Sequence, residues 1–187
     1  MKSPLLILLA TATASAVTIT LNPASGNLTA LPGQTVGWGF TVDSPTNYFV
    51  PTAVNFAPAS GDGVFADILG PRLTVFVAGP APDENPNVTE AFGIGLGTGL
   101  ASFTVNGGVA LGTVIAGNIL IDYDLFSVSP NNPSFDPGVH YLGAGTTISL
   151  DASVLVDNAS TSEVPEPSAA LLLAGGLLFA GLRMRRG

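Results

Sequence analysis

The residues of this sequence that could do chemistry are few, and their spacing is not that of a catalytic site. His140 is the only histidine and cysteine is absent, so a nucleophilic triad would need His140 as its base, with Asp136 nearby. No Gly-x-Ser-x-Gly turn frames such a triad. Asp122 and Asp124 share one face of an expected strand, where paired carboxylates could hydrolyse glycosides. Any solvated strand face has the same spacing, so we predict that the protein is not an enzyme.

Two loops carry enough oxygen ligands to raise the possibility of a structural calcium ion. Their residues are Asn131, Asn132 and Asp136 in one loop, and Asp83, Glu84, Asn85, Asn87 and Glu90 in the other. Neither loop has the spacing of an EF-hand or of a calcium-binding nonapeptide repeat. Asn and Asp also form turns without any ion. The prediction is therefore no metal and no cofactor, with calcium left open as the alternative.

Three further patterns have structural explanations. Glycine alternates over residues 93–99, but no helix and no lysine follow, so this stretch is a connection and not a nucleotide loop. Trp38 could stack on a sugar, yet it lies on the apolar face of an expected strand, which favours core packing. The glycosylation-type sequences at Asn27, Asn87 and Asn158 are expected to be chance matches.

The last two dozen residues carry three physical features in order. The first is a proline-flanked motif made of Val164, Pro165, Glu166 and Pro167. Its prolines hold the backbone extended. Residues 168–182 follow without any charge, as a transmembrane helix requires. The chain then carries a basic cluster that resists translocation, made of Arg183, Arg185 and Arg186.

This combination resembles the PEP-CTERM sorting signal of Gram-negative bacteria. The resemblance covers only residues 164–187, where motif, apolar run and basic end occur together. It implies an exosortase-type membrane protease as partner, which processes such chains near the Pro-Glu-Pro motif, followed by delivery to the cell surface or an exopolysaccharide matrix. The alternative is an ordinary C-terminal membrane anchor behind a proline-containing spacer.

The N-terminus has the features of a secretory signal peptide over residues 1–16. Lys2 supplies a positive charge, residues 5–10 are apolar, and Ala14 and Ala16 form a small-x-small cleavage site. We expect the mature chain to begin at Val17. The chain would then pass through the inner membrane, be held there transiently by its tail, and reach the cell surface or extracellular matrix.

Charge restricts the partners of the region between these two signals. Residues 17–162 carry eleven acidic side chains and a single basic one, Arg72. Such a surface repels nucleic acid and anionic membranes, so we expect neither as a partner. Without cysteine there are no disulfides, and stability must come from a hydrophobic core.

Alternating hydrophobicity predicts an all-β domain over residues 17–157, joined by a spacer at residues 158–164 to the sorting signal at 165–187. The expected strands are residues 17–21, 34–42, 73–77, 101–105, 118–126 and 147–157. Strands separated by turns favour a single antiparallel β-sandwich, Ig-like or jelly-roll-like, with a barrel second. Residues 32–42, a Pro-Gly turn leading into an aromatic strand, weakly resemble the opening hairpin of bacterial Ig-like surface modules.

Two classes of function fit these features. The first is a non-enzymatic structural or adhesive protein of the surface or matrix. The alternative is a carbohydrate- or calcium-binding module, with extracellular polysaccharide as partner and a site built from the long loops at one edge of the domain.

Overall fold

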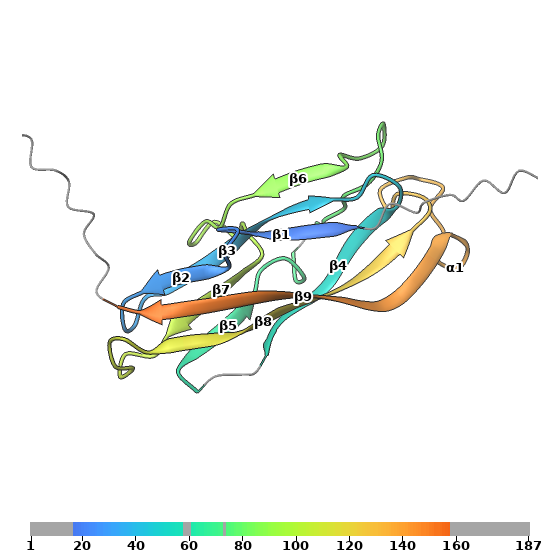
Figure 1. Cartoon of the computed structure of the whole chain (residues 1–187). Helices are drawn as coiled ribbons and strands as arrows, with labels where there is room; N and C mark the ends of the chain where they lie inside the picture. The colour runs from blue at the N-terminus through green and yellow to red at the C-terminus, as the bar shows by residue number, and fades with distance from the viewer. Residues whose placement is uncertain (1–16, 58–60, 73, 158–187) are drawn as a thin grey trace, which may run out of the picture. The chain divides into compact units, whose positions relative to one another are not determined.

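The computed structural model describes residues 17–57, 61–72 and 74–157 (Figure 1). The expected signal peptide with Ala14 and Ala16, the spacer, the Pro-Glu-Pro motif, the apolar run and the arginine cluster lie outside the described residues. Within the described ranges, no helix is both long enough and apolar enough to span a membrane.

The described chain is all-β, with one four-residue helix, and its strands form two sheets (Figure 1). The first sheet has the order β1-β3-β7-β5, with β6 also on β3, and the second has the order β2-β9-β8-β4. All pairs are antiparallel except β2 with β9, which is parallel. The elements are β1 Thr18–Asn22, β2 Asn27–Ala30, β3 Thr35–Asp43, β4 Tyr48–Ala57, β5 Gly63–Asp67, β6 Asn87–Glu90, β7 Ala101–Val105, β8 Val114–Phe126, α1 Pro137–His140 and β9 Tyr141–Val156.

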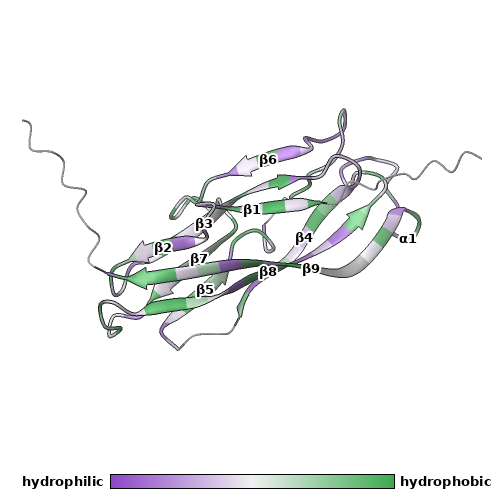
Figure 2. Cartoon of the chain, viewed as in Figure 1, coloured by the Kyte–Doolittle hydropathy of each residue, from purple (hydrophilic) through white to green (hydrophobic). Residues whose placement is uncertain are grey.

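The period-two pattern of the sequence puts alternate side chains of both sheets into one hydrophobic core. On β8, Ile119 and Ile121 are fully buried, and on β9 Val154 and Val156 are as well. Further along the same two strands, Asp122, Asp124 and Asp151 lie on the outward face, so a one-residue slip in the β8–β9 register would turn carboxylates into the core. Figure 2 shows both hydrophobic and hydrophilic patches along these two strands.

Trp38 joins the two sheets at the centre of this core. Its ring, on β3 of the first sheet, is fully buried and stacks on Phe56 of β4 in the second sheet, with centroids 6.3 Å apart. Its indole N–H donates to the carbonyl oxygen of Gly26 at 2.8 Å. The expectation that Trp38 is a core residue is confirmed.

β3 is covered on its second face as well, where the sequence places Gly37 and Gly39. A Cβ atom at Gly39 would lie 2.4 Å from the carbonyl oxygen of Glu90, and one at Gly37 would lie 2.4 Å from the ring of Phe92. Glycine is therefore needed because the segment after β6 crosses directly over the strand.

One expected strand is wrong, and four strands of the structure were not predicted. Residues 74–77 belong to no strand: Phe76 packs against Phe40 at 5.3 Å, and only Ala78 forms an isolated bridge, with Phe49. The β3 backbone at Phe40 already pairs with β1 and β6, so this segment has no free edge there. β4 escaped prediction because Pro51, next to a bulge, interrupts its pattern. The short strands β2, β5 and β6 were also missed.

Replacing Trp38 by alanine should lower the free energy of unfolding by about 3–5 kcal/mol, because it empties a large core volume and leaves the Gly26 carbonyl without its indole donor. Urea unfolding followed by circular dichroism measures the change. Val64→Ala is the control, since that side chain is 63% exposed and should alter stability by less than about 0.5 kcal/mol. A loss at Trp38 no larger than the control would contradict its central role.

Candidate functional site

The two oxygen-rich loops of the sequence meet at one end of the domain and form a pocket of about 180 Å³. We call it the loop pocket. It lies between the turn before β6 and the connection from β8 to α1. Its lining is Asp83, Glu84, Ser129, Asn131, Asn132 and Pro133.

Glu84 holds the two loops together. Its Oε1 atom accepts a hydrogen bond from the hydroxyl of Ser129 at 2.6 Å and another from the side-chain amide of Asn131 at 2.8 Å. Ser129, which is buried, also accepts the backbone N–H of Asn131 at 3.0 Å. The loop pocket is thus built by side chains that are 45 or more residues apart in sequence.

Tyr48, at the start of β4, extends the polar surface beside the loop pocket. Its hydroxyl donates to Asp83 Oδ2 at 3.1 Å. Burial raises the pKa of the Tyr48 phenol, and so do the hydrogen bond to Asp83 and the negative charges of Asp83 and Glu84. The phenol therefore stays a hydrogen-bond donor at neutral pH, next to two carboxylates. Sequence reasoning missed both Tyr48 and Ser129, because a strand tyrosine and a turn serine carry no motif.

The loop pocket brings together only part of the proposed calcium ligands. It contains Asp83, Glu84, Asn131 and Asn132, of which Asn132 also accepts the backbone N–H of Ser134. Three other candidates serve the fold: Asn85 accepts the backbone N–H of Asn87, Asp136 caps α1 and Glu90 binds Arg72. In the described part of the chain, no group of three or more His, Cys, Asp or Glu side chains could hold a metal ion. The arrangement suits recognition of hydroxyl groups better, since carboxylates and amides supply both acceptors and donors.

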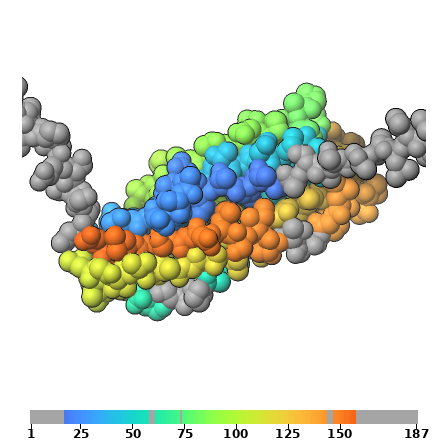
Figure 3. All heavy atoms as spheres, in the orientation of Figure 1, coloured from blue at the N-terminus to red at the C-terminus, as the bar shows by residue number. Residues whose placement is uncertain are grey.

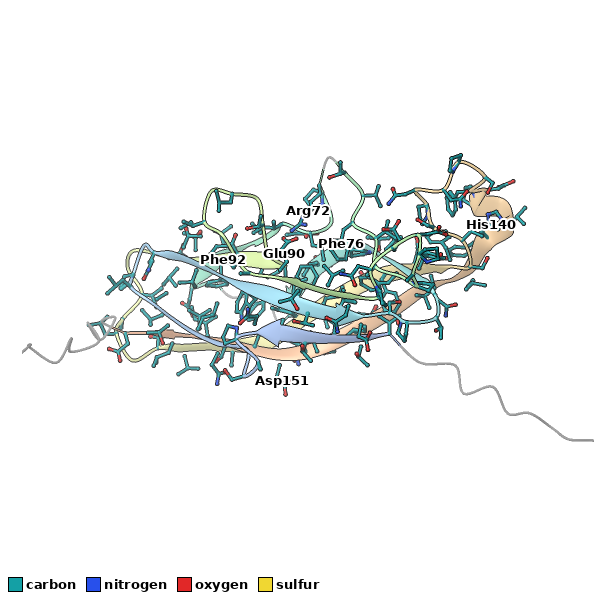
Figure 4. All side chains as sticks on the ribbon, turned by 90° about the horizontal axis from the view of Figure 1, so that it is seen from above. Arg72, Phe76, Glu90, Phe92, His140 and Asp151 are labelled. Carbon is teal, nitrogen blue, oxygen red and sulfur yellow. The ribbon has the colours of Figure 1, made fainter. Side chains whose placement is uncertain are left out.

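Arg72, the lone basic residue of the described chain, sits in a second polar cluster (Figure 4). Its guanidinium makes a two-pronged contact with the carboxylate of Glu90, the Nη1–Oε2 distance being 2.9 Å, and donates to the Gly99 carbonyl at 2.8 Å. The Gly99 N–H in turn donates to Glu90 at 2.5 Å. This cluster fastens the end of the 93–99 connection to β6, which gives it a structural role.

The charge balance of this cluster is visible in the pKa of Glu90. Burial alone would raise that pKa, but the hydrogen bonds from Arg72 and from the Gly99 N–H, together with the positive charge of Arg72, hold it below its usual value. Glu90 is therefore ionised at neutral pH, and it stabilises the folded state through Arg72.

The candidate triad residues His140 and Asp136 make local contacts in the structure. His140 ends α1, and its Nδ1 accepts the backbone N–H of Asp136 at 2.9 Å, while the Asp136 carboxylate accepts from Gly138 N at 2.8 Å. The carboxylate therefore does not orient the imidazole as a triad requires. Figure 4 places His140 far from Arg72 and Glu90.

The two carboxylates of β8 serve cross-strand contacts. Asp122 accepts from the hydroxyl of Thr147 at 2.5 Å, and Asp124 faces the hydroxyl of Tyr141 at 3.4 Å. Such pairs are ordinary features of an outward sheet face. Tyr123 between them is buried, as the alternation predicts.

Comparison with known proteins identifies no family. No family model and no curated protein matches the chain. A solved structure with some likeness is a family 123 glycoside hydrolase from Clostridium perfringens, studied for glycolipid glycan hydrolysis; it has 10% sequence identity and a TM-score of 0.24. The match covers 76% of this chain and only 28% of that chain. A likeness at this level carries no argument about fold or activity.

The Arg72–Glu90 pair should make stability depend on acid. Because the pKa of Glu90 is lower in the folded state, its contribution is complete above the pKa of an unfolded glutamate and is lost as pH falls through the folded value. Glu90→Gln should therefore show a melting temperature that falls less between pH 6 and pH 3 than that of the unchanged chain. Thermal scans measure this, with Asp151→Asn on the other sheet as control. Equal slopes in all three proteins would contradict a stabilising role for the pair.

Proposed function

We propose that this is an exported bacterial protein of the cell surface or extracellular matrix, sorted by its C-terminal Pro-Glu-Pro signal and without enzymatic activity. One observation carries the proposal: the motif around Glu166, the uncharged run of residues 168–182 and the terminal arginines occur together in that order. An exosortase-type protease would recognise the tail, and the N-terminal signal peptide would direct export.

We further propose that the domain over residues 17–157 is a β-sandwich of the Ig-like or jelly-roll-like kind. Two sheets that are antiparallel in all pairs but β2–β9, and that contribute to a single core, support this arrangement. The parallel β2–β9 pair closes one side of the second sheet and fits a Greek-key-like path better than a simple meander.

A structural or adhesive role agrees with the way this chain uses its reactive side chains. His140, Asp136 and Asp122 bind backbone or hydroxyl groups of their own neighbourhood. The domain has a strongly acidic composition and no cysteine, which keeps it soluble and inert toward thiol chemistry after export.

Replacing Glu166 by glutamine together with Pro165 and Pro167 by alanine should leave export intact and retain the protein in the inner membrane. The physical reason is that the protease would lose its recognition sequence while the apolar run and the arginines still anchor the chain. Intact mass in each cell fraction measures this. The unchanged chain should begin at Val17 and end near Pro165 in the surface or medium fraction.

Glu163→Gln is the matched control, because it removes a neighbouring carboxylate outside the motif. It should be processed normally. Normal processing of the triple variant would overturn the sorting proposal in favour of a plain anchor, as would a terminal arginine cluster retained in the unchanged chain.

The loop pocket favours a second candidate, a carbohydrate-binding module. Its two carboxylates, two asparagine side chains and the nearby Tyr48 hydroxyl offer hydrogen-bond partners for sugar hydroxyls, in a hollow of about 180 Å³. Because the proposed location is the cell surface or extracellular matrix, the exopolysaccharide of the bacterium that makes this protein is the expected ligand. A calcium ion is the alternative occupant of the same oxygens.

Glu84→Gln should weaken binding of host exopolysaccharide fragments by about tenfold or more, since it disturbs the contact that joins the two loops. Isothermal titration calorimetry, with and without a chelator, measures this. Asp151→Asn, on the outer face of β9, is the control and should bind normally. Binding that disappears with chelator and returns with Ca²⁺ would identify the ion as the ligand instead. If neither the exopolysaccharide fragments nor Ca²⁺ gives heat, this candidate function is overturned.

A further inference from the structure

Exposed apolar side chains surround the point where the described chain leaves β9. Leu31 is 39% exposed, Leu111 is 51% exposed and Val114 is 58% exposed. Leu155, half-buried, lies directly opposite Val114 across the β8–β9 pair. We call these four residues the exit patch.

Backbone hydrogen bonds bring the parts of the exit patch together. The N–H of Asp157 donates to the carbonyl of Ala30, next to Leu31, at 3.1 Å. The N–H of Gly112, next to Leu111, donates to the carbonyl of Val156 at 2.6 Å. Figure 3 shows the tip of β9 against the loop that precedes β8, and Figure 2 shows hydrophobic colouring at these two strand ends.

The length of chain beyond Asp157 restricts how far this patch can lie from a membrane. Ten residues, 158–167, separate Asp157 from the uncharged run of residues 168–182. They reach at most about 36 Å when fully extended. Once that run is in a bilayer, the exit patch is held near its surface. β9 has sixteen residues, so its first residue lies about 50 Å along the strand from the exit patch, at ~3.3 Å per residue. The short helix α1 adjoins that first residue (Figure 1).

We propose that the exit patch inserts into the surface of the lipid bilayer while the C-terminal segment anchors the chain; this rests on the membrane-anchored stage of the proposed function. Moving apolar side chains from water into the boundary of the acyl chains is favourable, because it removes their apolar surface from water. The exit patch then forms the contact between the domain and the bilayer, and β9 runs away from the membrane surface. The loop pocket faces away from the lipid.

The charge around the exit patch determines which kind of bilayer it can enter. The exit patch contains no basic side chain, Asp157 adjoins it, and Arg72, the only basic residue of the domain, is bound to Glu90 elsewhere. Attraction to anionic headgroups is therefore not the driving force. A zwitterionic bilayer suits the patch, and anionic lipid should weaken the insertion.

The absence of cysteine allows a site-specific test. The full chain is produced with its leader in a Gram-negative host, purified from the inner membrane and reconstituted in phosphatidylcholine vesicles. Separate variants Leu111→Cys, Val114→Cys and Leu142→Cys carry an environment-sensitive fluorophore. Leu142, 53% exposed at the start of β9, is the matched control because it has the exposure of Leu111 at the opposite end of the strand. Quenching by lipids with a spin label near the headgroup measures insertion, and vesicle flotation separately measures anchoring.

We expect several-fold stronger lipid quenching at positions 111 and 114 than at 142, reduced when half of the lipid is phosphatidylglycerol. A chain that floats with the vesicles but is quenched equally at all three positions overturns the insertion and leaves the anchoring intact. A blue-shifted fluorophore without lipid quenching points to a second copy of the chain on the patch, and it also overturns the insertion. A chain that does not float overturns both the anchor and the insertion.

Discussion

One buried hydrogen bond ties the first sheet to the second. The carbonyl of Gly26 accepts both the indole N–H of Trp38, from the first sheet, and the backbone N–H of Ser153, from the second. Gly26 has a φ of 70°, and a Cβ there would lie 2.2 Å from the carbonyl of Asp151. Only glycine therefore fits where the chain crosses from β1 to β2. The stacking of Trp38 on Phe56 depends on the same junction.

A domain without disulfides keeps its peripheral segments in place by other means. The segment after β6 lies on the glycine face of β3, and the Arg72–Glu90 pair fastens its far end at Gly99. Among residues 17–157, Arg72 is the one Lys or Arg beside many carboxylates, and a partly buried two-pronged contact is the geometry in which such a pair has a measurable effect. Its charge thus serves the fold and is not offered to anionic partners.

The long strand β9 separates two regions of different chemistry. At its start lie α1 and, through the β8–α1 connection, the polar loop pocket; at its end lie the apolar residues around Asp157. The proposed recognition surface and the proposed membrane contact therefore lie at opposite ends of the domain, and neither occupies the site of the other.

Period-two alternation is a local pattern, so it was enough to predict the all-β class and the inward face of β3, β8 and β9. The proline-flanked apolar run of the tail is also a local pattern, and the sorting that it predicts stays a prediction. It also indicated both loops of the pocket, as clusters of Asn and Asp. It could not show β4, whose Pro51 breaks the pattern, or that residues 74–77 would find no free strand edge.

Which polar residues meet depends on how distant parts of the chain pack together. Glu84 and Ser129 are 45 positions apart and touch because β4 and β6 begin, and β8 ends, at the same side of the domain. Glu90, which looked like a calcium ligand beside Asp83, instead pairs with Arg72, since the fold brings the one cation to it. Leu31 and Leu111 likewise come to the end of β9 because the adjacent residues, Ala30 and Gly112, bond to Asp157 and Val156. Contacts of this kind depend on strand pairing between distant segments, for which a local sequence pattern carries no information.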